Sequence, residues 1–275
     1  MYCVELKLQP TAALTFRILP GSILNIATYP FVPPTSLSGF LRRLCMMSAR
    51  SEIPETRINK DNPPTYLLPY RYVALGAYLS KDENKFSGVH RTYRKGMREF
   101  SHDDFSKLYL DGSKANFQLH TWEYLITEKL VGYVITDSAE GLEHIRGVES
   151  YGCYIGKEGY ALVAEVSEVI ELEQQTVEAF PSTVVPMDTL LQSNQFVGCD
   201  IYNLYRYNWL ANAHYQSNQE GLLGEEATPV NGFAPFVAAY FSRETGQPPI
   251  LDYYTDGEIH IPIALVNLLK GEVHV

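Results

Sequence analysis

The chain has 275 residues, of which 45% are hydrophobic and 20% are charged, a composition that favours a packed globular protein over a disordered one. No run approaches the roughly 20 apolar residues of a membrane-spanning helix, and the N-terminus lacks a signal peptide, so we expect a cytoplasmic protein with no membrane partner. The four cysteines are widely spaced and the seven histidines form no metal-binding motif. We therefore expect no metal, no cofactor and no disulfide scaffold.

The net charge of −10 argues against a nucleic-acid partner, but the charge is unevenly distributed. Residues 1–115 hold 16 Lys and Arg against 10 Asp and Glu, whereas residues 116–275 hold 6 against 22. A chain with halves of opposite sign can meet a polyanion with one surface, while the other surface is solvated or meets a cationic partner.

The first elements are predicted from hydrophobic periodicity. Residues 2–9 alternate between apolar and polar side chains, which predicts a half-buried strand. Prolines in residues 10–34 indicate an extended connection. Thr35 or Ser36 offers a cap for an amphipathic helix over residues 35–50, whose apolar side chains recur at helical spacing.

The later elements follow from the same kinds of pattern: strands at 66–80, 117–137 and 160–172, a short helix at 142–147, and a hairpin at 253–261 around an Asp-Gly turn. The resulting order of strand, helix, strands, short helix and strand is that of a ferredoxin-like unit. We therefore predict an α+β fold, although this order alone does not fix a function.

The segment Lys85–Arg98 carries the strongest local signal for binding. It contains five Lys and Arg and no acidic residue, with Phe86 and Tyr93 interleaved. Cations neutralise phosphates and aromatic rings stack on bases, so the segment favours nucleic-acid binding. The alternative is a solvated basic loop without a partner.

Two further segments could contact an anion. In Gly152–Tyr160, glycines allow a close backbone approach to a phosphate, but the spacing does not match a Walker A loop, and a tight turn is the simpler alternative. At the predicted helix start, Thr35 and Ser36 present hydroxyls where the helix dipole favours negative charge, although capping alone would explain them.

Catalytic patterns are weak. The one enzymatic alternative is metal-independent RNA cleavage, in which His90 acts as acid or base, Tyr93 assists and Lys95 stabilises charge in the transition state. Ordinary contacts within a basic segment explain these three residues more simply, so we expect a protein that is not an enzyme.

Three segments together resemble the Cas5 family of the RAMP superfamily, which are subunits of type I CRISPR Cascade complexes. TYPFVPPTSLSGFLRR at residues 28–43 resembles the family's N-terminal signature. YGCYIGKEGY at 151–160 resembles its glycine-rich loop, and EYLIT at 123–127 resembles the stretch before its middle strands. The resemblance extends over residues 1–170.

This resemblance implies a modified ferredoxin-like (RRM, RAMP) fold with an inserted "thumb" hairpin. We expect the RAMP domain to span residues 1–170, the basic thumb to lie at about 81–116, and residues 171–275 to form a β-rich extension packed on the same domain. The implied function is that of a non-catalytic subunit that binds the 5′ handle of the CRISPR RNA (crRNA) in a prokaryotic antiviral complex. The alternative is an endoribonuclease that processes precursor crRNA.

The resemblance also implies partners: the Cascade backbone subunits, whose filament this subunit would cap, the large subunit, and target DNA reached through the complex. It leaves open the CRISPR subtype and whether the complex serves defence or a transposon, in which case transposition proteins would be further partners. The residues that we expect to contact RNA are Thr35, Ser36, Arg42, Arg43, Lys85, Arg91, Tyr93, Arg94, Lys95, Arg98, Gly152, Tyr154, Gly156, Lys157 and Gly159. The aromatic-rich segment 196–215 is expected to be core or a surface for a protein partner.

Overall fold

The computed structural model describes residues 1–18, 25–48, 72–80, 87–97, 117–193, 195, 197–211, 227–242 and 247–270. Within these ranges the protein is a mixed α+β fold with four sheets whose strand pairs are antiparallel except for one. The predicted fold class is therefore confirmed. None of the helices in these ranges has the length and hydropathy needed to cross a membrane.

The central sheet has the strand order of a ferredoxin-like unit. Its main elements, in chain order, are β1 (Tyr2–Pro10), α1 (Pro34–Ser48), β3 (Val73–Leu79), β6 (Leu130–Thr136), α3 (Glu140–Arg146) and β8 (Tyr160–Val166). In space the strands lie in the order β3-β6-β1-β8, and each neighbouring pair is antiparallel. If the four strands are counted along the chain, this order is 2-3-1-4, as in the ferredoxin-like fold. β7 (Gly152–Tyr154) extends the sheet beyond β8, and β9 (Ile170–Glu171) pairs with β1.

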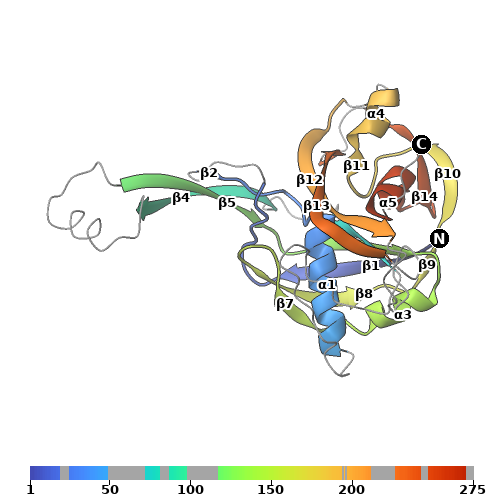
Figure 1. Cartoon of the computed structure of the whole chain (residues 1–275), viewed down its shortest axis with the longest axis horizontal. Coiled ribbons are helices and arrows are strands. Elements are labelled where there is room, and N and C mark those ends of the chain that lie inside the picture. Colours follow the sequence, from blue (N-terminus) through green and yellow to red (C-terminus); the bar gives the residue numbers. More distant parts are fainter. Residues whose placement is uncertain are drawn as a thin grey trace.

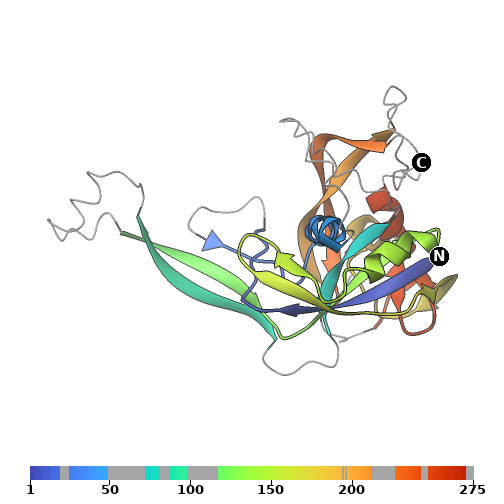
Figure 2. The same ribbon diagram turned by 90° about the horizontal axis from the view of Figure 1, so that it is seen from below.

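The core lies between this sheet and α1. Val4, Leu6 and Leu8 of β1 are buried, as the alternation predicts, while Lys7 between them is exposed. Leu37 of α1 packs against Gly132 of β6, where a side chain would meet it. α1 and α3 lie on the same face of the sheet (Figure 2).

The start of α1 differs from the prediction. The helix begins at Pro34, and the Leu37 N–H donates to the Pro33 carbonyl (3.0 Å). Proline is favoured at the first helical position because its φ is already helical and it has no N–H to satisfy. Thr35 and Ser36 therefore lie inside the first turn, and neither is the cap.

A long hairpin leaves the sheet between β3 and β6. It consists of β4 (Gly88–Met97) and β5 (Phe117–Ile126), and it projects from the rest of the molecule (Figure 1). β2 (Asn25–Ile26) pairs with its base in parallel. A bridge between Leu14 and Leu125, both fully buried, also holds the base to the core.

The C-terminal part adds two three-stranded sheets. One sheet contains β10 (Glu173–Glu178), β14 (Ile250–Thr255) and β15 (His260–Pro262). The other contains β11 (Val185–Pro186), β13 (Ala227–Tyr240) and β12 (Asp200–Ala211). The helices α4 (Met187–Ser193) and α5 (Ile263–Lys270) pack beside these sheets. The predicted Asp-Gly hairpin is confirmed as β14 and β15.

The C-terminal sheets share a core with the N-terminal unit. The ring of Phe31 lies 4.9 Å from that of Tyr240 and 5.4 Å from that of Tyr202, measured between centroids. Burial raises the pKa of Tyr240 to about 12, as expected for a phenol in this core. Of the strand predicted at 66–80, the described residues contain β3, Val73–Leu79, and residues 66–71 lie outside the described ranges. The strand predicted at 160–172 needs correction, because β8 ends at Val166 and the separate β9 follows at Ile170–Glu171.

Candidate nucleic-acid interface

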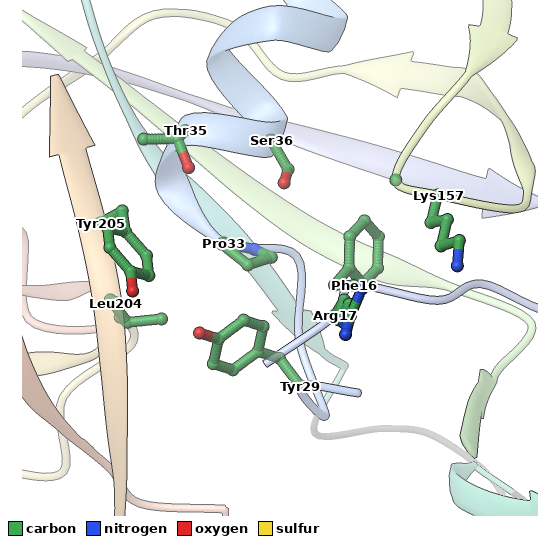
Figure 3. Close-up of a pocket in the computed structure, with 10 residues that line it drawn as sticks. Phe16, Arg17, Tyr29, Pro33, Thr35, Ser36, Lys157, Leu204 and Tyr205 are labelled. Atoms are coloured by element: carbon green, nitrogen blue, oxygen red, sulfur yellow. The ribbon is translucent and has the colours of Figure 1, made fainter. Parts of the chain in front are cut away.

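A pocket of about 310 Å³ opens at the start of α1. Its lining comes from the segment after β1, the residues before and at the start of α1, the turn between β7 and β8, and β12 (Figure 3). The lining residues are Phe16, Arg17, Tyr29, Pro33, Thr35, Ser36, Gly156, Lys157, Leu204 and Tyr205. Four residues that the sequence singled out as RNA-binding candidates, Thr35, Ser36, Gly156 and Lys157, thus meet in one place.

The helix start gives the pocket a polar wall. Thr35 and Ser36 are partly exposed, and both line the pocket (Figure 3). The first N–H groups of a helix have no acceptor within the helix, and the helix dipole adds a partial positive charge there. This wall can therefore donate hydrogen bonds to an anion.

The glycine-rich turn is held against the segment after β1. The Lys157 N–H donates to the Thr15 carbonyl (2.9 Å), and the Thr15 N–H donates to the Glu158 carbonyl (3.0 Å). Gly156 has a φ of +73°, and a Cβ there would lie 2.6 Å from the Thr15 carbonyl oxygen. At Gly159 a Cβ would lie 2.4 Å from Leu14. At Gly156 and Gly159, the turn therefore lies close to the chain's own residues 14–16. Gly152 is the first residue of β7.

Lys157 connects this turn to the base of the projecting hairpin. Its Nζ lies 4.4 Å from the centroid of the Trp122 ring, and Trp122 stacks on Tyr124 at 6.3 Å. The Trp122 indole N–H donates to the Thr15 hydroxyl (3.2 Å). A cation over an indole face is held in position while its charge still acts on the pocket.

Arg17 is a pocket residue that the sequence analysis did not select. Its Nε is buried and makes no hydrogen bond within the described part of the chain. A buried guanidinium N–H without a hydrogen bond is costly, and the guanidinium as a whole brings a positive charge to the lining of the pocket. The signal was present but weak: Arg17 is the only charged residue between Pro10 and Pro34.

Within the predicted basic segment, residues Gly88–Met97 form β4, one strand of the projecting hairpin. His90 and Arg91 are exposed, and Arg91 forms an ion pair with Glu123 of β5. The side chains of Tyr93, Arg94 and Lys95, and residues Lys85 and Arg98 altogether, lie outside the described residues.

Arg42 and Arg43 lie on opposite flanks of α1. The Arg42 guanidinium lies 4.9 Å from the centroid of the Tyr207 ring in β12. Arg43 is exposed and lies on the side of β7. Burial raises the pKa of the Cys153 thiol in β7, and the positive charge of Arg43 offsets part of this rise. The neighbouring Tyr154 side chain is 73% exposed, so its ring is open to stacking.

The site as described is a polar pocket with two cationic side chains, beside a projecting hairpin on a ferredoxin-like sheet. Groups of three or more His, Cys, Asp or Glu that could hold a metal ion do not occur in the described ranges. The arrangement suits an anionic ligand with flat rings, which is the chemistry of a nucleotide strand.

No family model and no curated protein matches the sequence. Among solved structures, the chain is similar to a CRISPR protein from Archaeoglobus fulgidus, with 11% identity, a TM-score of 0.36, and coverage of 94% of this chain and 97% of that one. It is also similar to a chain of the type III-B Cmr-beta complex bound to cognate target RNA and AMPPnP, with 13% identity, a TM-score of 0.31, and coverage of 85% and 86%. At these TM-scores the likeness does not by itself identify a family.

Proposed function

We propose that this protein is a non-catalytic, RNA-binding subunit of a CRISPR RNA-guided complex, which holds the 5′ handle of the crRNA. The observation that carries the proposal is the convergence of Arg17, Lys157 and the first turn of α1 on one pocket. These groups come from distant parts of the sequence, and together they offer charge and hydrogen-bond donors to a phosphate.

The surroundings of the pocket support a strand rather than a single small anion. Trp122 and Tyr124 lie at the base of the hairpin next to Lys157, and Tyr154 is exposed nearby on β7. Unpaired RNA is recognised by stacking on such rings together with contacts to phosphates. A volume of about 310 Å³ is at the lower end for a ligand site and suits one nucleotide of a longer strand.

The hairpin and the charge distribution support the type I assignment suggested by the sequence resemblance. β4 and β5 are inserted between the second and third strands of the ferredoxin-like order, where a thumb would bend the guide over the junction between handle and spacer. In this proposal the subunit caps the filament of backbone subunits beside the large subunit. The acidic side chains of residues 116–275, where 22 acidic stand against 6 basic residues, would then lie mainly on surfaces that face protein neighbours.

The test measures the affinity of the purified protein for a short fluorescent single-stranded RNA pool of random sequence. We expect Lys157→Glu to weaken binding by about tenfold or more, because it replaces a charge-assisted contact with repulsion. Lys129→Glu, which makes the same charge change at an exposed lysine between β5 and β6, is the matched control and should bind like the wild type. Equal affinity for the wild type and both variants would refute the pocket's role.

Two further measurements address the rest of the proposal. Sequencing of RNA that co-purifies with the protein from native cells should give guides with one fixed 5′ end. Incubation with repeat RNA in EDTA should give no cleavage. A cut product that His90→Ala abolishes would instead establish the nuclease alternative.

A further inference from the structure

The outer face of the β12–β13 hairpin carries aromatic side chains next to the pocket. In β12, Tyr205 and Tyr207 point to the same side because they are two residues apart. Phe233 of β13 is the register partner of Tyr207, and their ring centroids are 5.2 Å apart. The residues on the opposite face of the two strands point to the core: Leu204 of β12 is 1% exposed and Ala238 of β13 is fully buried.

This face runs along α1 from the pocket. Thr35 and Tyr205 line the pocket together at one end (Figure 3), and Arg42, two helical turns further on, lies over the Tyr207 ring. Gly39 lies between Thr35 and Arg42 along the helix, and a Cβ at Gly39 would have no atom within 4 Å. The small residue keeps the surface beside the aromatic face open.

Arg42, Tyr207 and Phe233 form a column of flat groups. The guanidinium lies 4.9 Å from the centroid of the Tyr207 ring, the Tyr207 and Phe233 rings are inclined by only 33°, and Phe233 is 49% exposed. About half of the Phe233 side chain is therefore accessible to a ligand. Both aromatic rings and guanidinium planes stack on unpaired bases.

We propose that Arg42, Tyr207 and Phe233 form a stacking platform for unpaired bases of the same RNA strand whose backbone enters the pocket. This inference rests on the proposed function and extends it to the C-terminal part, whose aromatic-rich segment 196–215 is expected from the sequence to be core or a surface for a protein partner. RNA is favoured over protein as the occupant because Tyr205 makes the platform continuous with the cationic pocket and because Arg42 supplies positive charge beside the rings. The aliphatic residues Ile201 and Val237 continue the same face away from Phe233.

The test compares Phe233→Leu with Val237→Ala in the full-length protein. Leucine keeps an apolar side chain but removes the aromatic face, while Val237 is a comparably exposed control on the same strand and face. The probe is the random single-stranded RNA pool with 2-aminopurine in place of adenine, whose fluorescence is quenched by stacking. We expect Phe233→Leu to weaken binding about fivefold or more, the range of one base–aromatic stack, and to reduce the quenching. Val237→Ala should leave both unchanged.

The outcomes separate the platform from the proposed function. An abasic RNA should bind the wild type and Phe233→Leu equally, since it has no base to stack. If Phe233→Leu matches the wild type in affinity and quenching while Lys157→Glu still weakens binding, the platform is refuted and the proposed function stands. If both Phe233→Leu and Val237→Ala impair the capture of a protein subunit but not of RNA, the face is a protein interface and the platform is likewise refuted. A wild-type protein that binds no RNA refutes both.

Discussion

Arg91 and Glu123 face each other across the projecting hairpin, with Arg91 Nη2 2.6 Å from Glu123 Oε1. The other carboxylate oxygen of Glu123 accepts a hydrogen bond from the Thr28 backbone N–H (3.2 Å). One acidic side chain thus holds a hairpin arginine and the segment before α1 together. Because its charge is already partly neutralised, Arg91 should contribute less to RNA binding than the two pocket cations.

The first prediction concerns this ion pair. Glu123→Gln should tighten RNA binding, because Arg91 becomes available to one phosphate of the strand. The slope of log affinity against log salt concentration should become steeper by up to about 0.7, the value for one phosphate contact on a single strand. The amide oxygen can still accept from Thr28, and an ion pair with an exposed arginine contributes at most about 1 kcal/mol, so stability should change little. Titrations at several salt concentrations measure the effect. Glu165→Gln, which frees Lys7 on the central sheet, is the control, and an equal gain in that variant would show that only net charge matters.

The second prediction compares the effects of alanine substitutions at two glycines on the free energy of unfolding. Gly156→Ala should lower the free energy of unfolding by at least about 1 kcal/mol, because φ is +73° and the new Cβ would meet the Thr15 carbonyl. Gly39→Ala should instead raise it by up to about 1 kcal/mol, since the position is helical and the space is open. Chemical denaturation of both variants measures the difference. A neutral Gly156→Ala would mean that the turn can move away from residues 14–16.

The central sheet could be predicted from the sequence because its signals are local. Alternation in residues 2–9 and the spacing of Leu37, Leu41 and Leu44 depend only on near neighbours, and these apolar residues are buried as expected. The exact start of α1 was missed because Pro34 is itself a good first residue, which leaves the more usual capping residues inside the helix. The Asp-Gly turn was found because its conformation requires those residue types.

The pocket could be predicted only in part because long-range pairing assembles it. Thr15 meets the Gly156–Glu158 turn through hydrogen bonds between residues more than a hundred positions apart, and no local pattern encodes that contact. Arg17 therefore gave no sequence signal beyond its isolation. Tyr207 lies in the segment expected to be core or a surface for a protein partner, and only the register with Phe233 and the contact with Arg42 reveal its neighbours.

The third prediction is a pH dependence from Glu5 in β1. Burial raises the pKa of this carboxyl, and Tyr133, which faces it in β6, offsets the shift only in part by hydrogen bonding. The native protein therefore binds this proton more tightly than the unfolded chain does. As the pH rises from the ordinary pKa towards the raised one, the free energy of unfolding falls, and this loss persists at neutral pH. Glu5→Gln should remove that loss.

The expected sign for Glu5→Gln is a gain in stability near pH 7 that disappears below the ordinary glutamate pKa of about 4.3, where the wild-type carboxyl is protonated in both states. Chemical denaturation at the two pH values measures it, with Glu171→Gln, an exposed residue of β9, as the control. A gain of the same size at both pH values would show that charge on Glu5 is not the cause.

The fourth prediction concerns the contact of α5 with the central unit. Lys270, at the end of α5, is 8% exposed, and its Nζ donates to both carboxylate oxygens of Asp137 at 2.9 and 3.2 Å. The Asp137 side chain is 68% exposed, so water screens the pair from one side. Asp137→Ala leaves a nearly buried ammonium without this partner and should lower the free energy of unfolding by about 1–2 kcal/mol, less than for a fully buried pair.

A second substitution distinguishes the cost of the unpaired charge from a loss of packing at Asp137. Lys270→Met on the Asp137→Ala background keeps the apolar stem and removes the ammonium, so it should recover part of the lost stability. The exposed pair Arg146–Glu168 is the control, and Glu168→Ala should cost no more than about 1 kcal/mol because both side chains are well solvated. If Lys270→Met lowers stability further on the Asp137→Ala background, the lysine is stabilised by contacts other than this carboxylate, and α5 is not held to the central sheet through this pair.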